Sequence, residues 1–297
     1  MKKNIISIGI PVYNEEQNIQ SLLSSVLSQR EEGFVIKEII IITDGSTDET
    51  VQKIKKINDK RIRLFVRRVR EGKSERLREI FELFQSEILL LIDGDIVIKN
   101  DTLFSDAIKN FNPHVHGIGS VDSVPIASKN FFGKIINHSV KIQSDIRKRW
   151  NNGMNYLAFK GCFLILSREF VYSLTPHYNL SEKSNDDAYL FFSAIEGGYR
   201  PRYIPSLKVY YKSPTSFRDH LSQSSRFQFS KEELERIFLR NLDKEYLIPK
   251  KIFFLSTLKY FIINPLLFTG YILIYLMAKI KRIRQVNNKW KIALSTK

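Results

Sequence analysis

The sequence of 297 residues has little sulfur and little tryptophan: one Cys, three Met and two Trp. The single cysteine, Cys162, cannot form a disulfide within the chain, which favours a reducing compartment. Because its neighbours are mostly apolar, we expect this thiol to be a small core residue rather than a nucleophile. No long apolar segment follows Met1, so we expect no secretory signal peptide and a chain that begins inside the cell.

Two common nucleotide-binding signatures are also absent. No Gly-x-Gly-x-x-Gly follows the first expected strand, and no complete Walker sequence ending in Gly-Lys-Ser/Thr occurs. Dinucleotide oxidoreductases and P-loop ATP hydrolases are therefore excluded. With 43% hydrophobic residues, the chain can still bury one large core or two modest ones.

Positive charge is abundant and unevenly distributed. From Lys244 onward there are eleven Lys or Arg and one acid, so about +10 of the net charge of +16 lies in the last 54 residues. The same part contains nineteen uncharged residues, Tyr260 to Ala278, which is long enough to span a bilayer. An apolar run followed by cations indicates a membrane more than a nucleic acid, and no nucleic-acid motif accompanies the charge.

The N-terminal part alternates short apolar runs with amphipathic segments. Asn14 is predicted to cap the first helix. This alternation predicts a mainly parallel sheet with helices on both faces and right-handed crossovers. The four expected strands are Ile5–Tyr13, Glu38–Ile42, Arg61–Val66 and Ile88–Ile92. Their carboxyl ends should meet at one crevice, where open α/β sheets bind ligands.

Polar side chains stand where these strands end. Asp44 follows the second strand, Lys73 opens the third helix, and Asp93 and Asp95 flank Gly94 after the fourth. A glycine lets a phosphate or metal approach the backbone, and two carboxylates around it can share a divalent cation and a sugar hydroxyl. Taken alone, Asp-Gly-Asp is more typical of an ordinary turn. The shared placement of all four strand ends favours a binding site.

In order and spacing, four segments resemble the successive motifs of family-2 glycosyltransferases of the GT-A fold: residues 10–16, 44–48, 72–73 and 93–95. The resemblance covers residues 4–228 and implies an enzyme that uses a nucleotide-sugar donor, a UDP- or GDP-sugar, with Mn²⁺ or Mg²⁺. It implies that Asp44 contacts the nucleotide base, Asp93 the ribose, and that Asp95 holds the metal. The nucleotide-sugar site that it implies also includes Pro11, Tyr13, Glu15, Lys73 and Arg226.

Later segments extend the resemblance. Lys160–Arg168 is similar to the glycine-containing strand that lines the acceptor side in the family, and residues 185–190 resemble its Glu-Asp motif. This registration implies that Asp187 is the general base, that Asp186 replaces the usual glutamate, and that the reaction inverts the anomeric carbon. Without the registration, a helix N-terminus that favours acidic residues explains the two aspartates as well.

Four positions depart from the family's pattern. Thr43 stands where many members have a first aspartate, so base recognition can differ, and Arg78 stands where asparagine is usual. Tyr211 occupies the place of a histidine metal ligand in some members, which leaves the third protein ligand open. Residues 223–227 resemble the family's Gln-x-x-Arg-Trp motif with Phe227 in place of the tryptophan, which argues against a processive polymer synthase.

Two domains are expected, a GT-A catalytic domain over 1–230 and a helical, basic, membrane-associating region over 231–297 with its apolar part at 252–280. Lys259 and Asn264-Pro265 interrupt that apolar part, which favours two shorter helices that enter or lie on one leaflet over a single crossing. Both basic flanks then stay at the cytoplasmic face. A helical pair packed on the catalytic domain or on a second subunit is the soluble alternative.

Residues 130–150 are predicted to form an amphipathic helix whose cations point outward: Lys141, Arg147, Lys148 and Arg149. A solvated face is the default interpretation, and an acceptor-side surface that meets lipid phosphates is the alternative. The sequence thus predicts a membrane-associated, metal-dependent glycosyltransferase acting on a lipid-linked or other cell-envelope acceptor. A glycosyltransferase with a soluble or protein acceptor, and a non-catalytic membrane scaffold that binds sugar nucleotides, are the alternatives.

Overall fold

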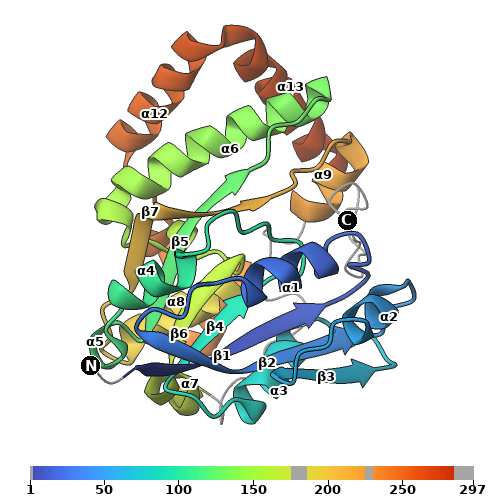
Figure 1. The fold of residues 1–297 in the computed structure, drawn as a ribbon. Coiled ribbons are helices and arrows are strands. Elements are labelled where there is room, and N and C mark those ends of the chain that lie inside the picture. Colours follow the sequence, from blue (N-terminus) through green and yellow to red (C-terminus); the bar gives the residue numbers. More distant parts are fainter. Residues whose placement is uncertain (1–2, 175–185, 225–229, 284–297) are drawn as a thin grey trace.

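The computed structural model of the chain describes residues 3–174, 186–224 and 230–283. A seven-stranded sheet in the order β3-β2-β1-β4-β6-β5-β7 forms the centre of this part (Figure 1). The strands are β1 Asn4–Val12, β2 Phe34–Asp44, β3 Ile62–Arg67, β4 Ile88–Ile92, β5 Ile118–Pro125, β6 Phe163–Ser167 and β7 Arg202–Tyr211. The four predicted N-terminal strands are confirmed.

The first half of the sheet is parallel, as predicted. β1 pairs in parallel with β2 and β4, and β2 pairs in parallel with β3. β6 lies antiparallel to both β4 and β5, while β7 runs parallel to β5. All five residues of β4 are buried because helices cover both faces, and this explains its unbroken run of Ile and Leu.

Helices pack on both faces of the sheet and form two cores. One core joins the sheet to α1, α2 and α4, and the other joins it to α3, α7 and α8. The helices are α1 Ile19–Leu27, α2 Thr50–Lys55, α3 Lys73–Leu83, α4 Leu103–Lys109, α5 Pro113–His116, α6 Phe131–Arg149, α7 Arg168–Leu174, α8 Asp186–Glu196, α9 Phe217–Ser224, α10 Ser230–Phe238, α11 Asp243–Tyr246, α12 Lys250–Ile263 and α13 Pro265–Ile283. The predicted α/β class is confirmed.

The loop between β1 and α1 corrects one prediction. Asn14 does not cap α1, whose N-cap is Asn18. Asn14 instead adopts a positive φ of 51°, and its side-chain oxygen accepts a hydrogen bond of 2.8 Å from the backbone N–H of Thr47. A short polar side chain tolerates this left-handed conformation better than a bulky one. Asn14 thereby ties the loop after β1 to the loop after β2.

The C-terminal apolar part forms a hairpin of two helices, α12 and α13, that meet at Asn264 and both pack on α6 (Figure 1). Pro265 begins α13, where its missing N–H costs nothing. The small Gly270 lets α13 approach Ile135 of α6, where a Cβ would lie 2.8 Å from the Ile135 side chain. In the described part of the chain, no helix has both the length and the apolar character needed to cross a bilayer.

A polar clamp also joins the hairpin to α6. Asp145 of α6 accepts hydrogen bonds from Ser256 Oγ at 2.7 Å and from Lys259 Nζ at 2.8 Å. His138 Nε2 lies 3.1 Å from the carbonyl oxygen of Tyr260. The charge of Lys259, which interrupts the apolar sequence, is therefore neutralised within the fold.

The predicted helix over 130–150 is confirmed as α6. The prediction that Arg147 points outward from this helix is wrong. Arg147 is only 1% exposed and pairs with Asp122 of β5, whereas Lys141, Lys148 and Arg149 are exposed. The partner of Arg147 lies in a strand 25 residues earlier. Because helical periodicity records only the apolar face, it cannot reveal a buried ion pair of this kind.

Candidate active site

The carboxyl ends of β1 and β4 open into a small pocket that α3, α8 and the start of β6 also line. The lining residues are Pro11, Lys73, Leu77, Leu91, Ile92, Asp93, Gly161, Leu164, Asp187 and Leu190. This is the edge of the sheet at which open α/β folds bind their ligands. Four residues predicted from the sequence, Pro11, Lys73, Asp93 and Asp187, are thus brought together.

Lys73 and Asp93 form an ion pair in this pocket. Gly72, with φ of 103°, turns the chain into α3 so that Lys73 is its first residue, and Lys73 Nζ lies 2.6 Å from Asp93 Oδ1. Burial by itself would lower the pKa of Lys73. Three carboxylates outweigh burial and raise that pKa well above its usual range: Asp93, Asp187 and Asp186. Lys73 therefore stays cationic and supplies fixed positive charge.

Asp187 is the second residue of α8 and is the acid best suited to exchange a proton. Burial raises the pKa of Asp187 to about 6, against the opposing effects of Lys73 and of a hydrogen bond from the Gly161 backbone. A Cβ on Gly161 would lie 2.5 Å from Asp187 Oδ1 and 2.7 Å from Lys73 Nζ. A larger residue there would displace one of these two side-chain ends. A carboxylate with this pKa can both take and return a proton near neutral pH.

Asp186 lies beside Asp187 but is more deeply buried. Its side chain is 5% exposed, and its Oδ1 accepts a hydrogen bond of 2.6 Å from Ser74 Oγ of α3. This bond holds the N-terminus of α8 against the N-terminus of α3, the two helix ends that carry Asp187 and Lys73. Asp186 thus contributes to the site by position and by its charge near Lys73.

The turn after β4 brings Asp95 to the same edge. Gly94 packs against the β1–α1 loop, where a Cβ would lie 2.9 Å from Glu15 Cγ and 3.1 Å from Val12 Cγ1. Glu15 itself is 3% exposed, and its Oε2 accepts a hydrogen bond of 2.8 Å from Asn18 Nδ2. Glu15 therefore forms part of the wall behind this turn, and Asp95, one residue after Gly94, is partly exposed.

The acids of this turn fit a metal that arrives together with phosphates. Among the residues that the structure describes, no three His, Cys, Asp or Glu side chains are arranged as a complete metal site. Mg²⁺ in enzymes is commonly held by one or two carboxylates plus substrate phosphate oxygens, and Mn²⁺ also prefers oxygen ligands. Asp95 and the neighbouring Asp93 supply ligands of that type.

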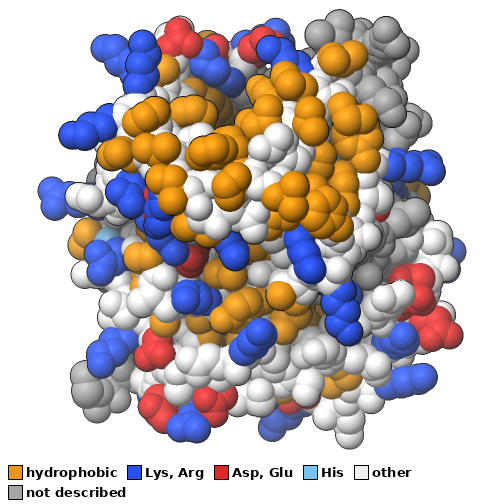
Figure 2. Space-filling model, turned by 90° about the horizontal axis from the view of Figure 1, so that it is seen from above, with side chains coloured by type: hydrophobic (Ala, Val, Ile, Leu, Met, Phe, Trp, Pro, Cys, Tyr) orange, Lys and Arg blue, Asp and Glu red, His pale blue; other side chains and the backbone are white. Residues whose placement is uncertain are grey.

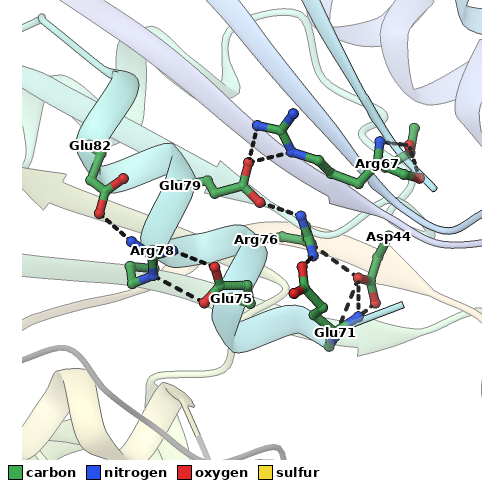
Figure 3. A network of polar contacts seen from close by, with 10 residues as sticks. Asp44, Arg67, Glu71, Glu75, Arg76, Arg78, Glu79 and Glu82 are labelled. Atoms are coloured by element: carbon green, nitrogen blue, oxygen red, sulfur yellow. Dashed lines mark hydrogen bonds and ion pairs between the residues drawn. The ribbon is translucent and has the colours of Figure 1, made fainter. Parts of the chain in front are cut away.

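Asp44, at the end of β2, is held in a network of polar contacts (Figure 3). Its Oδ1 accepts from the backbone N–H of Glu71 at 2.9 Å and from Arg76 Nε at 3.0 Å, and its Oδ2 accepts from the Gly72 N–H at 3.0 Å. Arg76 also pairs with Glu71 and Glu79. Asp44 thus fastens the loop before α3, with acceptor capacity remaining mainly on Oδ2. Its contact with a nucleotide base stays a prediction.

Tyr13 and Arg226 were also predicted to belong to the nucleotide-sugar site. The ring of Tyr13 lies under the guanidinium of Arg70, 4.4 Å from ring centroid to carbon, so a cation–π contact orients it beside the crevice. Arg226 lies outside the described residues.

Sequence reasoning missed Ser74 and Arg76, which shape the site, whereas Gly161 belongs to the Lys160–Arg168 segment that the resemblance assigned to the acceptor side. The glycine was detectable, because an isolated Gly next to a strand often marks a close approach. Burial raises the pKa of Cys162 to about 12, so its thiol is protonated at neutral pH. The carbonyl oxygen of Cys162 accepts the Asp93 N–H at 3.3 Å, which joins β6 to the acidic turn.

The model of the family described as "Glycosyl transferase family 2" matches residues 7–170. This chain belongs to that family. The match includes the end of β1 and all of β2 to β6, and with them Lys73, Asp93, Asp95 and Gly161. Asp187 lies beyond it.

Curated relatives match only part of this family member. An uncharacterized glycosyltransferase of Haemophilus influenzae is 34% identical over 105 residues, which are 35% of this chain and 41% of that protein. The poly-beta-1,6-N-acetyl-D-glucosamine synthase of Staphylococcus epidermidis is 38% identical over 100 residues, which are 33% of this chain and 24% of that protein. The matched part thus spans less than half the length of each relative.

Solved structures share the fold over a longer range. The mannosyltransferase PcManGT of Pyrobaculum calidifontis, solved with GDP-Man and Mn²⁺, superposes with a TM-score of 0.59 over 94% of this chain and 76% of its own, at 17% identity. The glucosyl-3-phosphoglycerate synthase of Mycobacterium tuberculosis, solved with Mn²⁺, UDP and phosphoglyceric acid, gives 0.55 over 79% and 78%, at 19% identity. At these identities the similarity shows a common GT-A fold.

Proposed function

We propose that this chain transfers a sugar from a nucleotide-sugar donor to an acceptor hydroxyl, with a divalent metal as cofactor. The observation that carries the proposal is the meeting of Lys73, Asp93 and Asp187 around Gly161 at the strand ends of a family-2 glycosyl transferase. A fixed cation beside a carboxylate of raised pKa is what a reaction needs when it creates an anionic leaving group and releases a proton. Donors of the UDP- or GDP-sugar type, as bound by the similar solved proteins, are the first candidates.

Each acid has a separate role in this reaction. Asp93 binds the donor's ribose, and Asp95 holds the metal, which supplies positive charge to the diphosphate when bound. Asp187 accepts the proton of the acceptor hydroxyl while that oxygen bonds to the anomeric carbon and the bond from this carbon to the diphosphate breaks. Attack from the side opposite the leaving group inverts the anomeric carbon.

We also propose that the acceptor is lipid-linked or otherwise part of the cell envelope and that the chain works at the cytoplasmic face of a membrane. The support is the outer face of the α12–α13 hairpin, on which Figure 2 shows apolar side chains gathered. The large exposed side chains there are Phe253, Phe254, Leu255, Leu258, Phe261, Ile262, Ile263, Leu266, Ile272, Leu273, Tyr275, Leu276, Met277 and Ile280. An apolar face of this extent beside lysines is typical of helices that lie in one leaflet of an anionic bilayer.

The transferase proposal is tested by nucleoside diphosphate release from UDP-, GDP- and dTDP-sugars, with Mn²⁺ or Mg²⁺ and then with chelator, in the presence of membrane lipid extract. We expect metal-dependent release from one donor that Asp95→Asn and Asp187→Asn each abolish. Asp101→Asn is the matched control, because Asp101 is an exposed acid that pairs with Arg30 and does not line the pocket. Binding of a donor without turnover would favour the alternative of a non-catalytic scaffold. Turnover with a soluble acceptor but not with lipid extract would overturn the proposal of a lipid-linked acceptor.

The membrane proposal is tested by vesicle co-sedimentation. The variant Ile263→Asp with Leu266→Asp places two charges at the tip of the hairpin, where both residues are more than half exposed. We expect it to bind anionic vesicles at least about tenfold more weakly, because each buried aspartate opposes transfer into the interface. Val69→Asp, at an apolar side chain that is 67% exposed outside the hairpin, should bind as the wild type does. Equal binding by all three would contradict insertion of the hairpin.

A further inference from the structure

The turn after β4, which carries Asp95, is held from two sides. On one side, the Val97 N–H donates to the carbonyl oxygen of Tyr210 in β7 at 2.8 Å, and the Tyr210 N–H donates back at 3.0 Å. On the other side, Gly94 packs so closely on Glu15 that a Cβ would lie 2.9 Å from Glu15 Cγ. Asp95 stands between these two fixed points in the chain. Its backbone is therefore positioned by β7 and by the β1–α1 loop together.

Two hydrogen bonds connect these supports to each other. Lys212, the residue directly after β7, donates from Nζ to Asn18 Oδ1 at 2.9 Å. The Nδ2 of Asn18 donates in turn to Glu15 Oε2 at 2.8 Å. Together with the bridge to β7, these contacts close a ring around the turn that carries Asp95. Residues almost 200 positions apart in the sequence thus meet at this turn.

The link joins a cation to a buried acid through one amide. Glu15 is 3% exposed and Asn18 is 8% exposed. A buried carboxylate is costly unless polar groups compensate it. The ammonium of Lys212 bonds the oxygen of the Asn18 amide and the carboxylate of Glu15 accepts from its nitrogen, so both hydrogen bonds are charge-assisted. Such bonds polarise one another, and the two charges fix the amide in one orientation.

The side chain of Asn18 is used for this link and not for its helix. Asn18 is the N-cap residue of α1, yet its side chain makes no capping hydrogen bond. An asparagine at this position normally accepts a hydrogen bond from a backbone N–H of the first turn. Here the amide lies between Lys212 and Glu15 instead. This use of the side chain points to a role in the neighbouring turn rather than in the stability of α1.

We propose that Lys212 is a positioning residue for Asp95, the proposed metal ligand, and acts on it through Asn18 and Glu15. The inference rests on the proposed function, because the metal role of Asp95 belongs to that function. Residues that orient a metal ligand from behind commonly change the metal affinity about ten- to a hundredfold when they are replaced. Lys212 thereby contributes to the site from outside the pocket, whose described lining residues do not include it.

The test measures the Kd of UDP and GDP for the full chain by calorimetry, once with Mn²⁺ and once with chelator. The ratio of the two values gives the affinity gained from the metal. We expect Lys212→Met to reduce this gain at least about tenfold, and Lys212→Arg, which keeps a charged donor, to restore most of it. Lys208→Met is the matched control, because Lys208 is an exposed lysine of β7. An unchanged gain in Lys212→Met overturns the proposal, even if this variant is less stable.

Two further results separate positioning from other roles of Lys212. If Lys212→Met weakens metal-free nucleotide binding as much as binding with Mn²⁺, Lys212 contacts the donor itself and the proposal is overturned. If Lys212 acts through Asn18, the double variant with Asn18→Ala should lose no more of the gain than either single variant. Losses that multiply in the double variant overturn the proposal. Asn18→Ala removes no capping hydrogen bond, so it carries the test if Lys212→Met does not fold.

The same data distinguish failure of this inference from failure of the proposed function. If Mn²⁺ strengthens nucleotide binding equally in the wild type and in Lys212→Met, the inference fails and the proposed function stands. If Mn²⁺ strengthens the binding of neither nucleotide to the wild type, the proposed metal-dependent function fails and the inference fails with it.

Discussion

Replacing Asp187 by asparagine is expected to abolish turnover while making the folded protein more stable at neutral pH. Burial raises the pKa of this carboxyl from 3.8 to about 6, so the folded state holds the proton more tightly than the unfolded state. Ionisation of the folded protein then costs about 2–3 kcal/mol above pH 6. Asparagine has the shape of the neutral acid and avoids this cost, but it cannot accept a proton, so the rate should fall at least about a hundredfold.

Urea unfolding followed by tryptophan fluorescence measures the effect, since Trp150 is buried. For a raised carboxyl pKa, stability is highest when the group is protonated and is lost as the pH rises through the folded value. The Asp187→Asn variant should therefore gain about 2–3 kcal/mol over the wild type near pH 7.5 and about half of that near pH 5. Asp101→Asn, at an exposed pair, should change stability by less than about 1 kcal/mol. An Asp187→Asn variant no more stable than the wild type at either pH would refute the assignment of Asp187 as a buried, ionised base.

Three other variants test the surroundings of the pocket. Arg76→Met should destabilise the protein by about 3–5 kcal/mol because it leaves the buried carboxylate of Asp44 without its counter-ion, whereas Arg78→Met, two residues later and 38% exposed, should cost less than about 1 kcal/mol in the same unfolding assay. An equal loss of unfolding free energy in the two variants would show that burial does not determine how much these ion pairs stabilise the fold. Lys73→Met removes the cation that lowers the pKa of Asp187, so the acidic limb of the pH–rate profile should move above about pH 6; a limb that stays in place would mean that another group titrates. Gly161→Ala brings a methyl group within 2.5 Å of Asp187 Oδ1, so turnover should fall at least about tenfold with the fold retained by circular dichroism. Full activity would show that the pocket widens.

The parts of the site that follow strand ends could be predicted from the sequence. Asp93 directly follows an apolar run, and Lys73 stands at the start of a helix. The alternation of such runs and helices along the chain predicts the parallel sheet whose strand ends bring the two residues together. The prediction for Asp187 depended on a resemblance, because two acids at a helix start are equally typical of a favourable dipole. The pocket places Asp187 against Lys73, 114 positions away in the sequence.

The parts that depend on single long-range contacts could not be predicted. Arg147 was expected to face solvent, but its ion pair with Asp122 is invisible to helical periodicity. Asn14 was expected to cap a helix, yet it bonds to Thr47 in another loop. Arg76 reaches Asp44 across 32 residues and uses acceptor capacity that the sequence alone leaves open for a ligand. In each case a short polar side chain or a buried cation has several possible partners, and only the packed fold selects one.

The raised pKa of Cys162, whose side chain is only partly exposed, makes the chain suitable for site-specific labelling. With a pKa of about 12, only about one thiol in ten thousand or fewer is ionised near neutral pH, so thiol-reactive probes will attack it very slowly. A cysteine introduced on the exposed face of the hairpin, for example at Ile263, would then be the one that reacts quickly among the described positions. A fluorophore or spin label at that position can report the depth of the hairpin in a bilayer while the native thiol is left in place.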